Sequence, residues 1–452
     1  MPHRRLNVLI YPMWSVDSIN ADSNYIIIKQ ICNELIPTGR FNFYLIMDSN
    51  RKYVRDDLNK MVRLIGLPQP RSKKLQVAAW NTNALRQILD RLPIDIVWNN
   101  VVERGHHFKW WQDTLEAYVR PIVFNYHHYV IHRSLNHVAY YNPCQHILAD
   151  QLSGSLQADC NYFHTQHCRD MLFEEAADWL HPKKIDDLES RTICHLGGYC
   201  NPIASQEKYD KFTFVYNHRM AGYKNWRTTW ELFDQLHDED FEFEVILTGG
   251  DKGGLTKASR PYTKIRAFTT HADYLQELAR CHANVINSQH ETYCIAIAES
   301  MMCDQVVVAP NAVTFPELLG QAYPYLFDTV EAQLEMLRQI LTNDVRQYNH
   351  DTDRLLVSNH AKYIGGLWTG LYDKMKGHKK VLEAIRDDSK RTQIAAFMEK
   401  HTKFRLEAFV KLIRKLNLET QAFPISKIKM LLDEQGFQHN FATDMFEKRT
   451  KK

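Results

Sequence analysis

The sequence is poor in glycine. Only 17 of its 452 residues are glycine, whereas glycine makes up about 7% of an average protein. The one glycine-rich stretch, TGGDKGG at residues 248–254, lacks the lysine and hydroxyl residue that end a G-x-x-x-x-G-K-[ST] loop. This stretch is therefore not a P-loop, and we expect it to be a loop beside a nucleotide.

Cysteine pairs and long apolar runs are also missing. The nine cysteines are odd in number and form no C-x-x-C pair, which indicates free thiols in a reducing compartment. No stretch approaches the ~20 apolar residues that a membrane-spanning helix needs, and the run LNVLIYPMW at residues 6–14 is too short for a secretory signal. We therefore expect a soluble, cytoplasmic protein.

The charge is unevenly distributed along the chain. The net charge is +3 overall, but residues 374–452 hold 19 Lys and Arg against 10 Asp and Glu, which gives +9 there and −6 on the rest. Such a basic tail indicates an acidic partner or, equally, a solvated lysine-rich face. With 44% hydrophobic residues, the 452-residue chain is long enough for two or three globular domains.

Short β-branched and aromatic runs alternate with amphipathic stretches, which is typical of an α/β protein with parallel sheets. In the first half we predict strands at residues 6–12, 41–47, 93–100, 121–128 and 158–165. In the second half we predict strands at residues 212–218, 241–250, 263–268, 283–288 and 305–310. Two such halves enclose a cleft, and ligands of these sheets bind at the carboxyl ends of the strands.

Two glutamates stand in a distinctive context at residues 288–320, SQHETYCIAIAESMMCDQVVVAPNAVTFPELLG. Glu291 lies where a predicted strand meets a helix, and Glu299 lies two turns inside that helix. A Glu-x7-Glu spacing alone carries no information, but a short strand and the pair Pro316-Glu317 follow in order. The order of these elements, rather than the spacing, is what points to a function.

Two cations follow the first strand of the same half. Arg219 comes after that strand, and Lys224 comes five residues later at the start of a predicted helix. Two cations and a helix N-terminus are suited to hold two phosphates that gain charge as a bond breaks. The plain alternative is a pair of solvent-exposed loop residues.

Together these patterns resemble the donor site of retaining nucleotide-sugar glycosyltransferases of the family-4 kind, which have the GT-B fold of two Rossmann-like domains facing a cleft. The resemblance covers residues 6–341 and is strongest at residues 212–320. It implies a retaining hexosyl- or pentosyltransferase that needs neither metal nor cofactor and takes a nucleotide-diphosphate sugar as donor.

The resemblance also implies how the chain is divided. We expect a Rossmann-like acceptor domain, a linker, a Rossmann-like donor domain, a crossover helix back to the first domain and a basic helical extension, at residues 1–185, 186–211, 212–345, 346–375 and 376–452. Within the extension, residues 400–416 predict a helix with Phe404, Ala408, Leu412 and Leu416 on one stripe.

The resemblance implies a role for each site residue. Glu291 would accept hydrogen bonds from the donor sugar and so contact substrate rather than protein core, and Glu299 would hold the ribose. Arg219 and Lys224 would balance the leaving diphosphate. The remaining donor-side residues are Thr292, Tyr293, Cys294, Ile295, Phe268 beside Ala267, and His128.

Two departures from the family accompany these roles. Thr292 and Cys294 replace glycines that follow the first glutamate in the family, so the backbone that approaches the donor sugar carries side chains there. His127 corresponds to the family's histidine facing the donor sugar, and His128 stands where the family often has aspartate. A structural histidine is the alternative for His127.

Of the two substrates, the acceptor is the one that the sequence defines least. We expect the stretches HHFKWWQ at residues 106–112 and HHYVIHR at residues 127–133 to form a loop. They combine basic and aromatic residues, which can neutralise phosphates and stack on an extruded base. A hydroxylated base in DNA is therefore one acceptor; a saccharide or lipid is the alternative, and a non-catalytic nucleotide-binding module is the third. We place Asp22, Asn24, Trp110 and His107 on the acceptor side, although the tryptophans also suit a core.

No metal site is expected. Asp238-Glu239-Asp240 forms a D-x-D motif, but it ends a predicted helix away from the cleft, where we expect a solvated turn. The scattered histidines and cysteines do not complete a tetrahedral zinc site.

Overall fold

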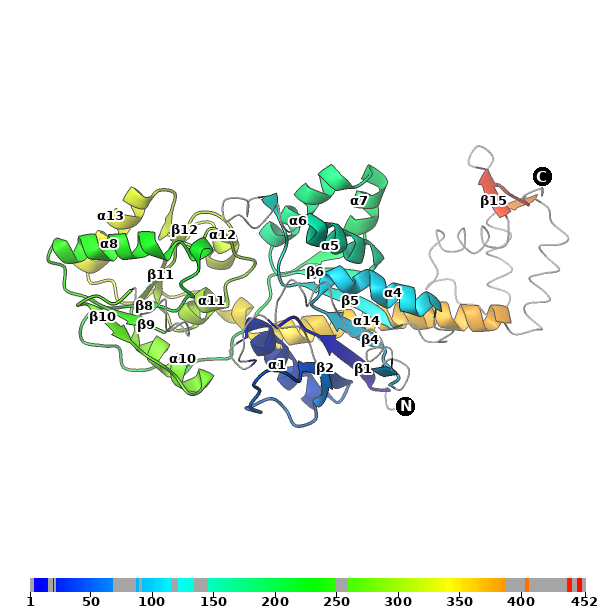
Figure 1. The fold of residues 1–452 in the computed structure, drawn as a ribbon, viewed down its shortest axis with the longest axis horizontal. Coiled ribbons are helices and arrows are strands. Elements are labelled where there is room, and N and C mark those ends of the chain that lie inside the picture. Colours follow the sequence, from blue (N-terminus) through cyan, green and yellow to red (C-terminus); the bar gives the residue numbers. More distant parts are fainter. Residues whose placement is uncertain are drawn as a thin grey trace. The chain divides into compact units, whose positions relative to one another are not determined.

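The computed structural model describes residues 4–14, 19, 22–67, 87–88, 92–114, 121–133, 145–248, 258–386, 403–405, 437–440 and 445–448. The chain divides into two compact units, Met1–Ile364 and Gly365–Lys452. The first unit contains two parallel sheets (Figure 1). We call residues 6–194 the first lobe and residues 213–342 the second lobe.

The first lobe is built on a seven-stranded parallel sheet of order β3-β2-β1-β4-β5-β6-β7. Its strands are β1 Leu6–Tyr11, β2 Phe41–Asp48, β3 Arg63–Leu67, β4 Ile96–Asn99, β5 Ile122–His127, β6 Cys160–Phe163 and β7 Thr192–Cys194. Its helices are α1 Ser23–Leu35, α4 Gly105–Thr114, α5 Gln145–Gln157, α6 Gln166–Trp179 and α7 Pro182–Glu189. Helices lie on both faces of this sheet (Figure 1).

Burial on both faces explains why the central strands are mostly apolar. Leu9 of β1 packs in a cluster with Phe108 of α4 and Leu148 of α5. Its neighbours Val8 and Ile10, whose side chains point to the opposite face, are buried as well.

The second lobe is built on a six-stranded parallel sheet of order β10-β9-β8-β11-β12-β13. Its strands are β8 Thr213–Tyr216, β9 Glu244–Leu247, β10 Thr263–Ile265, β11 Ala283–Val285, β12 Val306–Pro310 and β13 Leu326–Phe327. Its helices are α8 Trp226–Asp238, α10 His271–Arg280, α11 Ile295–Met302, α12 Phe315–Leu319 and α13 Val330–Thr342.

Alternate residues of β8 serve the two faces of the second sheet. Phe214 packs with Phe233 of α8 and Leu337 of α13, whereas Val215 packs with Leu278 of α10. The predicted α/β architecture of two Rossmann-like lobes is confirmed.

Both sheets reverse their strand order at one point. In the first sheet β1 lies between β2 and β4, and in the second β8 lies between β9 and β11. The crevice at the carboxyl ends of the two strands that flank such a point is where parallel sheets bind ligands. The second lobe therefore points to the loops after β8 and β11.

Three details of the first lobe differ from the sequence prediction. Residues 186–211, predicted as a linker, contain the end of α7 and all of β7, so the strand at 158–165 is not the last of its sheet. Strand β3 was not predicted. Both strands are short, partly exposed edge strands with few buried apolar residues.

The stretch 106–112, predicted as a loop, lies within α4. Phe108 packs this helix against the core of the first lobe.

After the second lobe the chain returns to the segment that follows β7. The amide of Cys200 donates to the carbonyl of Leu355 at 3.0 Å, and the amide of Val357 donates to the carbonyl of Cys200 at 2.9 Å. Helix α14, Val357–Arg386, starts here. Its His360 ring lies 5.0 Å from the ring of Tyr199, centroid to centroid.

The second unit contains a three-stranded antiparallel sheet of order β14-β16-β15. Its strands are β14 Lys403–Arg405, β15 Phe437–Asn440 and β16 Met445–Lys448. The prediction of a purely helical extension is therefore wrong at these strands, and the helix predicted over 400–416 is interrupted at Lys403–Arg405. Pairing between distant segments overrides the local helical pattern here. Ala408, Leu412 and Leu416 lie outside the described residues.

No helix among the described residues combines the length and the apolar character that crossing a bilayer requires.

Candidate active site

Lys224 and Glu291 meet at the reversal point of the second sheet. Lys224 ends a short 3-10 turn, Gly222–Lys224, after β8, and Glu291 lies in the loop after β11. The amide of Gln289 donates to the carbonyl of Tyr223 at 2.8 Å and ties the two loops together. The ammonium of Lys224 then forms an ion pair with Oε1 of Glu291, with side chains only 9% and 12% exposed.

The electrostatics of this pair favour the charged form of Lys224. Burial disfavours the charged lysine, but the carboxylate of Glu291 outweighs it and raises the pKa of Lys224 above its ordinary value. Arg219 is exposed, and its Nη2 donates to the hydroxyl of Tyr223 at 3.0 Å. Both cations lie beside one turn, and Glu291 contacts Lys224 rather than open space.

The loop after Glu291 adopts an unusual backbone conformation. Cys294, the residue before α11, has φ of 75° and ψ of 74°, and no side chain caps the helix. The left-handed region is disfavoured for residues other than glycine. The resemblance places a glycine at this position, and the structure explains that preference because the conformation is kept although the glycine is not.

Glu299 is held by two side chains that the sequence did not single out. His271 Nε2 donates to one carboxylate oxygen at 2.7 Å, and the hydroxyl of Tyr274 donates to the other at 2.9 Å. Asn217 Nδ2 donates to the Tyr274 hydroxyl at 2.9 Å. Nothing local marks His271 or Tyr274, because their role arises from packing α10 on α11. The ring of Phe268 lies 5.8 Å from that of Tyr274.

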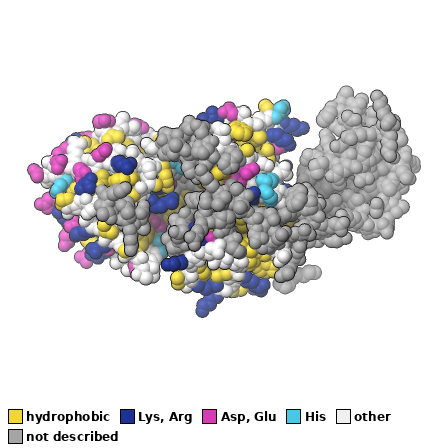
Figure 2. Space-filling model, viewed as in Figure 1, with side chains coloured by type: hydrophobic (Ala, Val, Ile, Leu, Met, Phe, Trp, Pro, Cys, Tyr) yellow, Lys and Arg dark blue, Asp and Glu magenta, His cyan; other side chains and the backbone are white. Residues whose placement is uncertain are grey.

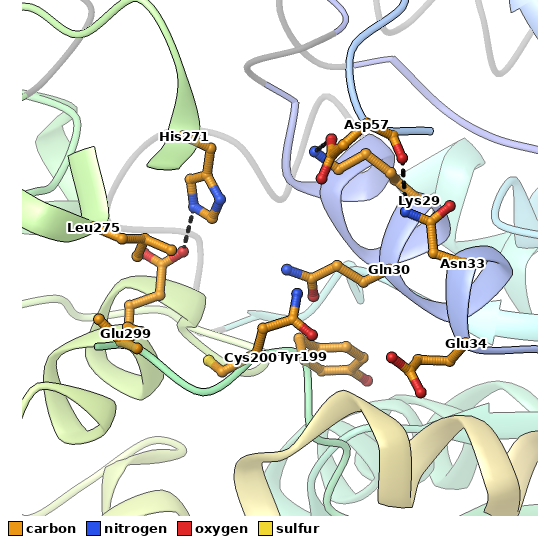
Figure 3. Close-up of a pocket in the computed structure, with 12 residues that line it drawn as sticks. Lys29, Gln30, Asn33, Glu34, Asp57, Tyr199, Cys200, His271, Leu275 and Glu299 are labelled. Carbon is orange, nitrogen blue, oxygen red and sulfur yellow. Dashed lines mark hydrogen bonds and ion pairs between the residues drawn. The ribbon is translucent and has the colours of Figure 1, made fainter. Parts of the chain in front are cut away.

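A pocket of about 220 Å³ opens beside Glu299. Glu299, His271 and Leu275 line it from the second lobe, and one polar face of α1 lines it from the first (Figure 3). Tyr199, Cys200, Asn201 and Ile203, between the lobes, complete the lining. Neither Lys224 nor Glu291 lines this pocket. The two glutamates of the Glu-x7-Glu pattern therefore serve separate parts of the site.

The residues after Glu291 turn toward the first lobe. Thr292 Oγ1 donates to the carbonyl of His128 at 3.0 Å, and the carbonyl of Thr292 accepts from Thr165 Oγ1 at 2.8 Å. The ring of Tyr293 lies 4.7 Å from that of Tyr199, edge to face. Thr292 thus contacts the first lobe, Tyr293 contacts the segment between the lobes, and Ile295 begins α11.

Glu317, on α12, makes a second connection between the lobes. Its carboxylate oxygens accept hydrogen bonds from the amides of Gln166 and His167, each at 2.7 Å. These amides open α6, where the helix dipole favours a negative charge. The sequence had marked Pro316-Glu317 only as part of a pattern.

Comparisons with known proteins give a fold and no close relative. No protein-family model matches the chain, and no curated protein matches its sequence. Sucrose-phosphate synthase from Thermosynechococcus elongatus superposes with a TM-score of 0.59 at 16% identity, covering 84% of this chain and 100% of the other. The chain has the GT-B fold.

Two further GT-B structures support this assignment. The lipopolysaccharide outer core galactosyltransferase WaaB has a TM-score of 0.51 at 12% identity, covering 80% of this chain and 100% of the other. A glycosyltransferase from Rickettsia africae ESF-5 has a TM-score of 0.53 at 12% identity, covering 82% and 99%. At these identities the likeness concerns the fold alone.

His127 does not face the cleft between the GT-B lobes in this structure. Its ring is fully buried, stacks on Phe163 with centroids 4.0 Å apart, and lies 3.2 Å from the side-chain oxygen of Asn161. Burial lowers the pKa of His127 to about 4, so the ring is neutral. His128, the next residue, is the one in contact with the second lobe.

Asp22 and Asn24 are structural residues at the reversal point of the first sheet. The Asp22 carboxylate accepts from the amide of Asn24 at 2.9 Å and caps α1. Asn24 donates to the carbonyl of Met13 at 2.7 Å and accepts from Asn100 at 3.1 Å. Both predicted acceptor residues are buried, so they shape the site without lining its surface.

The other two predicted acceptor residues lie on α4. The side chain of Trp110 lies outside the described residues. The ring of His107 lies 4.1 Å from that of His106, and burial lowers the pKa of His107 to about 4.

Acidic side chains are interspersed with Lys and Arg over the second lobe (Figure 2), so that surface gives no preference for an anionic acceptor.

Within the described residues, no group of three or more His, Cys, Asp or Glu side chains is arranged to hold a metal ion. In the D-x-D motif, Glu239 follows the last residue of α8 and pairs with Arg338 at 2.5 Å. The carboxylate of Glu239 is therefore already bound to a cation.

Proposed function

We propose that this protein transfers a sugar from a nucleotide-diphosphate donor to an acceptor hydroxyl, with retention of configuration and without a metal ion. The observation that carries the proposal is the ion pair of Lys224 and Glu291 at the reversal point of the second sheet. A cation and a carboxylate placed together there match the two charged halves of such a donor, its diphosphate and its hydroxyl-bearing sugar.

Donor binding would exchange the partners of this pair. The diphosphate takes the ammonium of Lys224 and attracts the exposed guanidinium of Arg219, and both bind phosphate through charge-assisted hydrogen bonds. The carboxylate of Glu291 is then free to accept hydrogen bonds from the sugar. The uncapped amides at the start of α11 favour negative charge at the same place.

Transfer itself would place negative charge on the leaving diphosphate. The bond between the anomeric carbon and the diphosphate oxygen breaks, the acceptor oxygen bonds to that carbon from the same face, and the acceptor proton passes to the departing diphosphate. Lys224 and Arg219 stabilise the charge that develops on the diphosphate. No side chain is assigned as a nucleophile.

Two acceptor classes are proposed, each on one observation. A hydroxylated base in DNA is favoured by the +9 charge of residues 374–452. A saccharide or lipid is favoured by the fold neighbours, whose names specify sucrose phosphate and lipopolysaccharide.

The proposal is tested with a panel of nucleotide sugars. One of them should raise the melting temperature and be hydrolysed slowly, and activity should survive EDTA. Lys224→Ala should slow turnover about 100- to 1000-fold, the usual effect of removing one preorganised charge, whereas Lys264→Ala, at an exposed ion pair on β10, should not. If no nucleotide sugar stabilises the protein, it is not a glycosyltransferase.

Offering hydroxymethylated duplex DNA and oligosaccharides to the same preparation then separates the acceptors. NMR of the product reads its anomeric configuration, and inversion would overturn the retaining mechanism.

A further inference from the structure

Thr292 stands where the resemblance places a glycine, and its side chain is engaged with the first lobe. Its hydroxyl donates to the carbonyl of His128 at 3.0 Å, and its own carbonyl accepts from the hydroxyl of Thr165 at 2.8 Å. The described residues with positive φ include Cys294 but not Thr292, so the backbone at Thr292 does not require glycine. What the threonine adds at this position is a hydroxyl that bonds the first lobe.

Thr165 is a firm anchor for Thr292. It is fully buried, and the hydroxyl that donates to Thr292 also accepts from the amide of Cys168 at 3.2 Å as the N-cap of α6. A hydroxyl donates one hydrogen bond and accepts others, so both bonds form together. The carbonyl of Thr292 is thus tied to the start of a 14-residue helix.

The loop that carries His128 is held from inside the first lobe. The amide of Ile131 donates to Oε1 of Gln151 at 3.0 Å, and Nε2 of Gln151 donates to Glu103 at 2.7 Å. The hydroxyl of Tyr129 donates to the same carboxylate oxygen. Glu103 and Gln151 are fully buried, where hydrogen bonds are costly to break, so the backbone around His128 has little freedom to move.

Thr292 lies between the charged and the strained positions of the loop after β11. Glu291 precedes it and pairs with Lys224, and Cys294 follows two residues later with φ of 75°. Misplacing a group that acts on the substrate by about 1 Å can slow a reaction roughly 100-fold. The anchors of Thr292 therefore bear on the position of Glu291.

We propose that Thr292 is a positioning residue: through its hydroxyl and its carbonyl, the first lobe sets where Glu291 meets the donor sugar. This inference rests on the proposed function. The donor stays in the second lobe, and the first lobe acts on it through this loop. The role also accounts for a threonine at a glycine position, because glycine has no hydroxyl to donate.

Hydrogen exchange of the intact protein without ligand tests the anchoring. Thr292→Val keeps the size and branching of the side chain but removes its donor. The amides of Ile297 and Ala298, which donate to the carbonyl of Cys294 at 3.1 and 3.3 Å, should then exchange about five-fold faster, the effect of one lost hydrogen bond. Thr292→Ser keeps a hydroxyl and should exchange like the unaltered protein.

A matched control removes a threonine hydroxyl elsewhere. Thr38, in the short turn before β2, donates to the carbonyl of Leu35 at 2.6 Å. Thr38→Val should leave exchange after Cys294 unchanged. Thr292→Ala removes the hydroxyl without a branched side chain and should match Thr292→Val, so the test does not depend on one variant that folds.

Ligand affinities test the positioning of Glu291. UDP-glucose, GDP-mannose and ADP-glucose are compared by calorimetry with UDP, GDP and ADP. For the pair that binds, Thr292→Val should weaken the nucleotide sugar about ten-fold, the effect of one weakened hydrogen bond to a charged group. It should weaken the nucleoside diphosphate less than about two-fold, because the diphosphate lacks the sugar. Thr292→Ser should restore the ratio, whereas a merely structural role would leave the ratio unchanged in every variant.

The outcomes are distinct. Unchanged exchange, or an unchanged ratio of the two affinities, would overturn the inference, while binding of a nucleotide sugar by the intact protein would uphold the proposed function. If the intact protein bound none of the six compounds, the proposed function and the positioning role would both be overturned.

Discussion

Cys294 is the residue at which the backbone of the candidate site departs furthest from ordinary geometry. A non-glycine residue at φ 75° costs roughly 1 to 2 kcal/mol relative to an ordinary conformation. Strain of this size persists only where the surrounding structure holds it in place. Here the loop is held by Glu291 on one side and by Thr292 contacting the first lobe on the other.

The strain at Cys294 predicts an inverted order of stability. At most positions alanine is more stable than glycine, but here Cys294→Gly should be more stable than Cys294→Ala by about 1 kcal/mol, because glycine adopts the left-handed region without penalty. Chemical denaturation of the two variants measures the difference. The ordinary order, alanine above glycine, would show that the backbone is not strained.

At the scale of elements, α6 depends on a cap from the other lobe. Thr165 caps it locally by accepting from the amide of Cys168 at 3.2 Å, and Glu317 accepts from the first two amides of the helix. A carboxylate at a helix N-terminus gains from hydrogen bonds and from the helix dipole together. Contact with the second lobe therefore stabilises a helix that the first lobe alone would leave partly uncapped.

Glu317→Gln should lower the free energy of unfolding by about 1 kcal/mol, since it removes the charge but keeps an acceptor. Glu317→Ala should lower it further, because two amides then lose their acceptor. Glu231→Gln, on the exposed part of α8, is the matched control and should be neutral. Equal stability of all three variants would mean that the contact contributes nothing.

Prediction of elements from the sequence succeeded where packing and local pattern agree. Strands buried on both faces, such as β12, are continuous apolar runs and were predicted. Edge strands β3 and β7 were missed, because partial exposure removes the apolar signal that identifies a strand. The strands of the second unit were missed because pairing between distant segments is invisible in a local pattern.

The candidate site was predictable only in part, for the same reason. The proximity of Lys224 and Glu291 could be predicted, because each follows a strand of the second half and those two strands flank the reversal point. The partners of Glu299 depend on how α10 packs against α11, which no local spacing encodes. His127 is the last residue of β5 and its ring is buried, whereas His128 lies just beyond the strand, where its backbone carbonyl accepts a hydrogen bond from Thr292.

At the scale of the whole molecule, neutral buried histidines are a recurring feature. Burial lowers the pKa of His127, His282 and His290 to about 4 and that of His360 to about 3, against about 6.5 in an unfolded chain. Between about pH 4 and pH 6.5 the unfolded chain therefore binds more protons than the folded one. Stability is therefore fully present above about pH 6.5 and is lost as the pH falls toward 4.

His360→Phe should weaken this acid sensitivity. Neither ring nitrogen of His360 has a hydrogen-bond partner among the described residues, so phenylalanine removes a proton site without breaking a bond. Near pH 5 the slope of unfolding free energy against pH should fall by up to about 1.4 kcal/mol per pH unit, the value for one proton. Melting curves from pH 7 to pH 4.5 measure it, and an unchanged slope would show that His360 is protonated in the folded state.

The pairing of Leu355 with Cys200 also implies a delay during synthesis of the chain. A ribosome has released every strand of the first sheet by residue 194, yet the segment that pairs with Cys200 emerges about 150 residues later. At typical elongation rates of roughly 5 to 20 residues per second, the aromatic surface around Tyr199 waits on the order of 10 s for His360 to cover it. Arrested nascent chains ending near residue 345 should consequently be cleaved faster by protease near residue 200 than chains ending beyond residue 386, and chaperones that bind exposed aromatic residues have that interval in which to act.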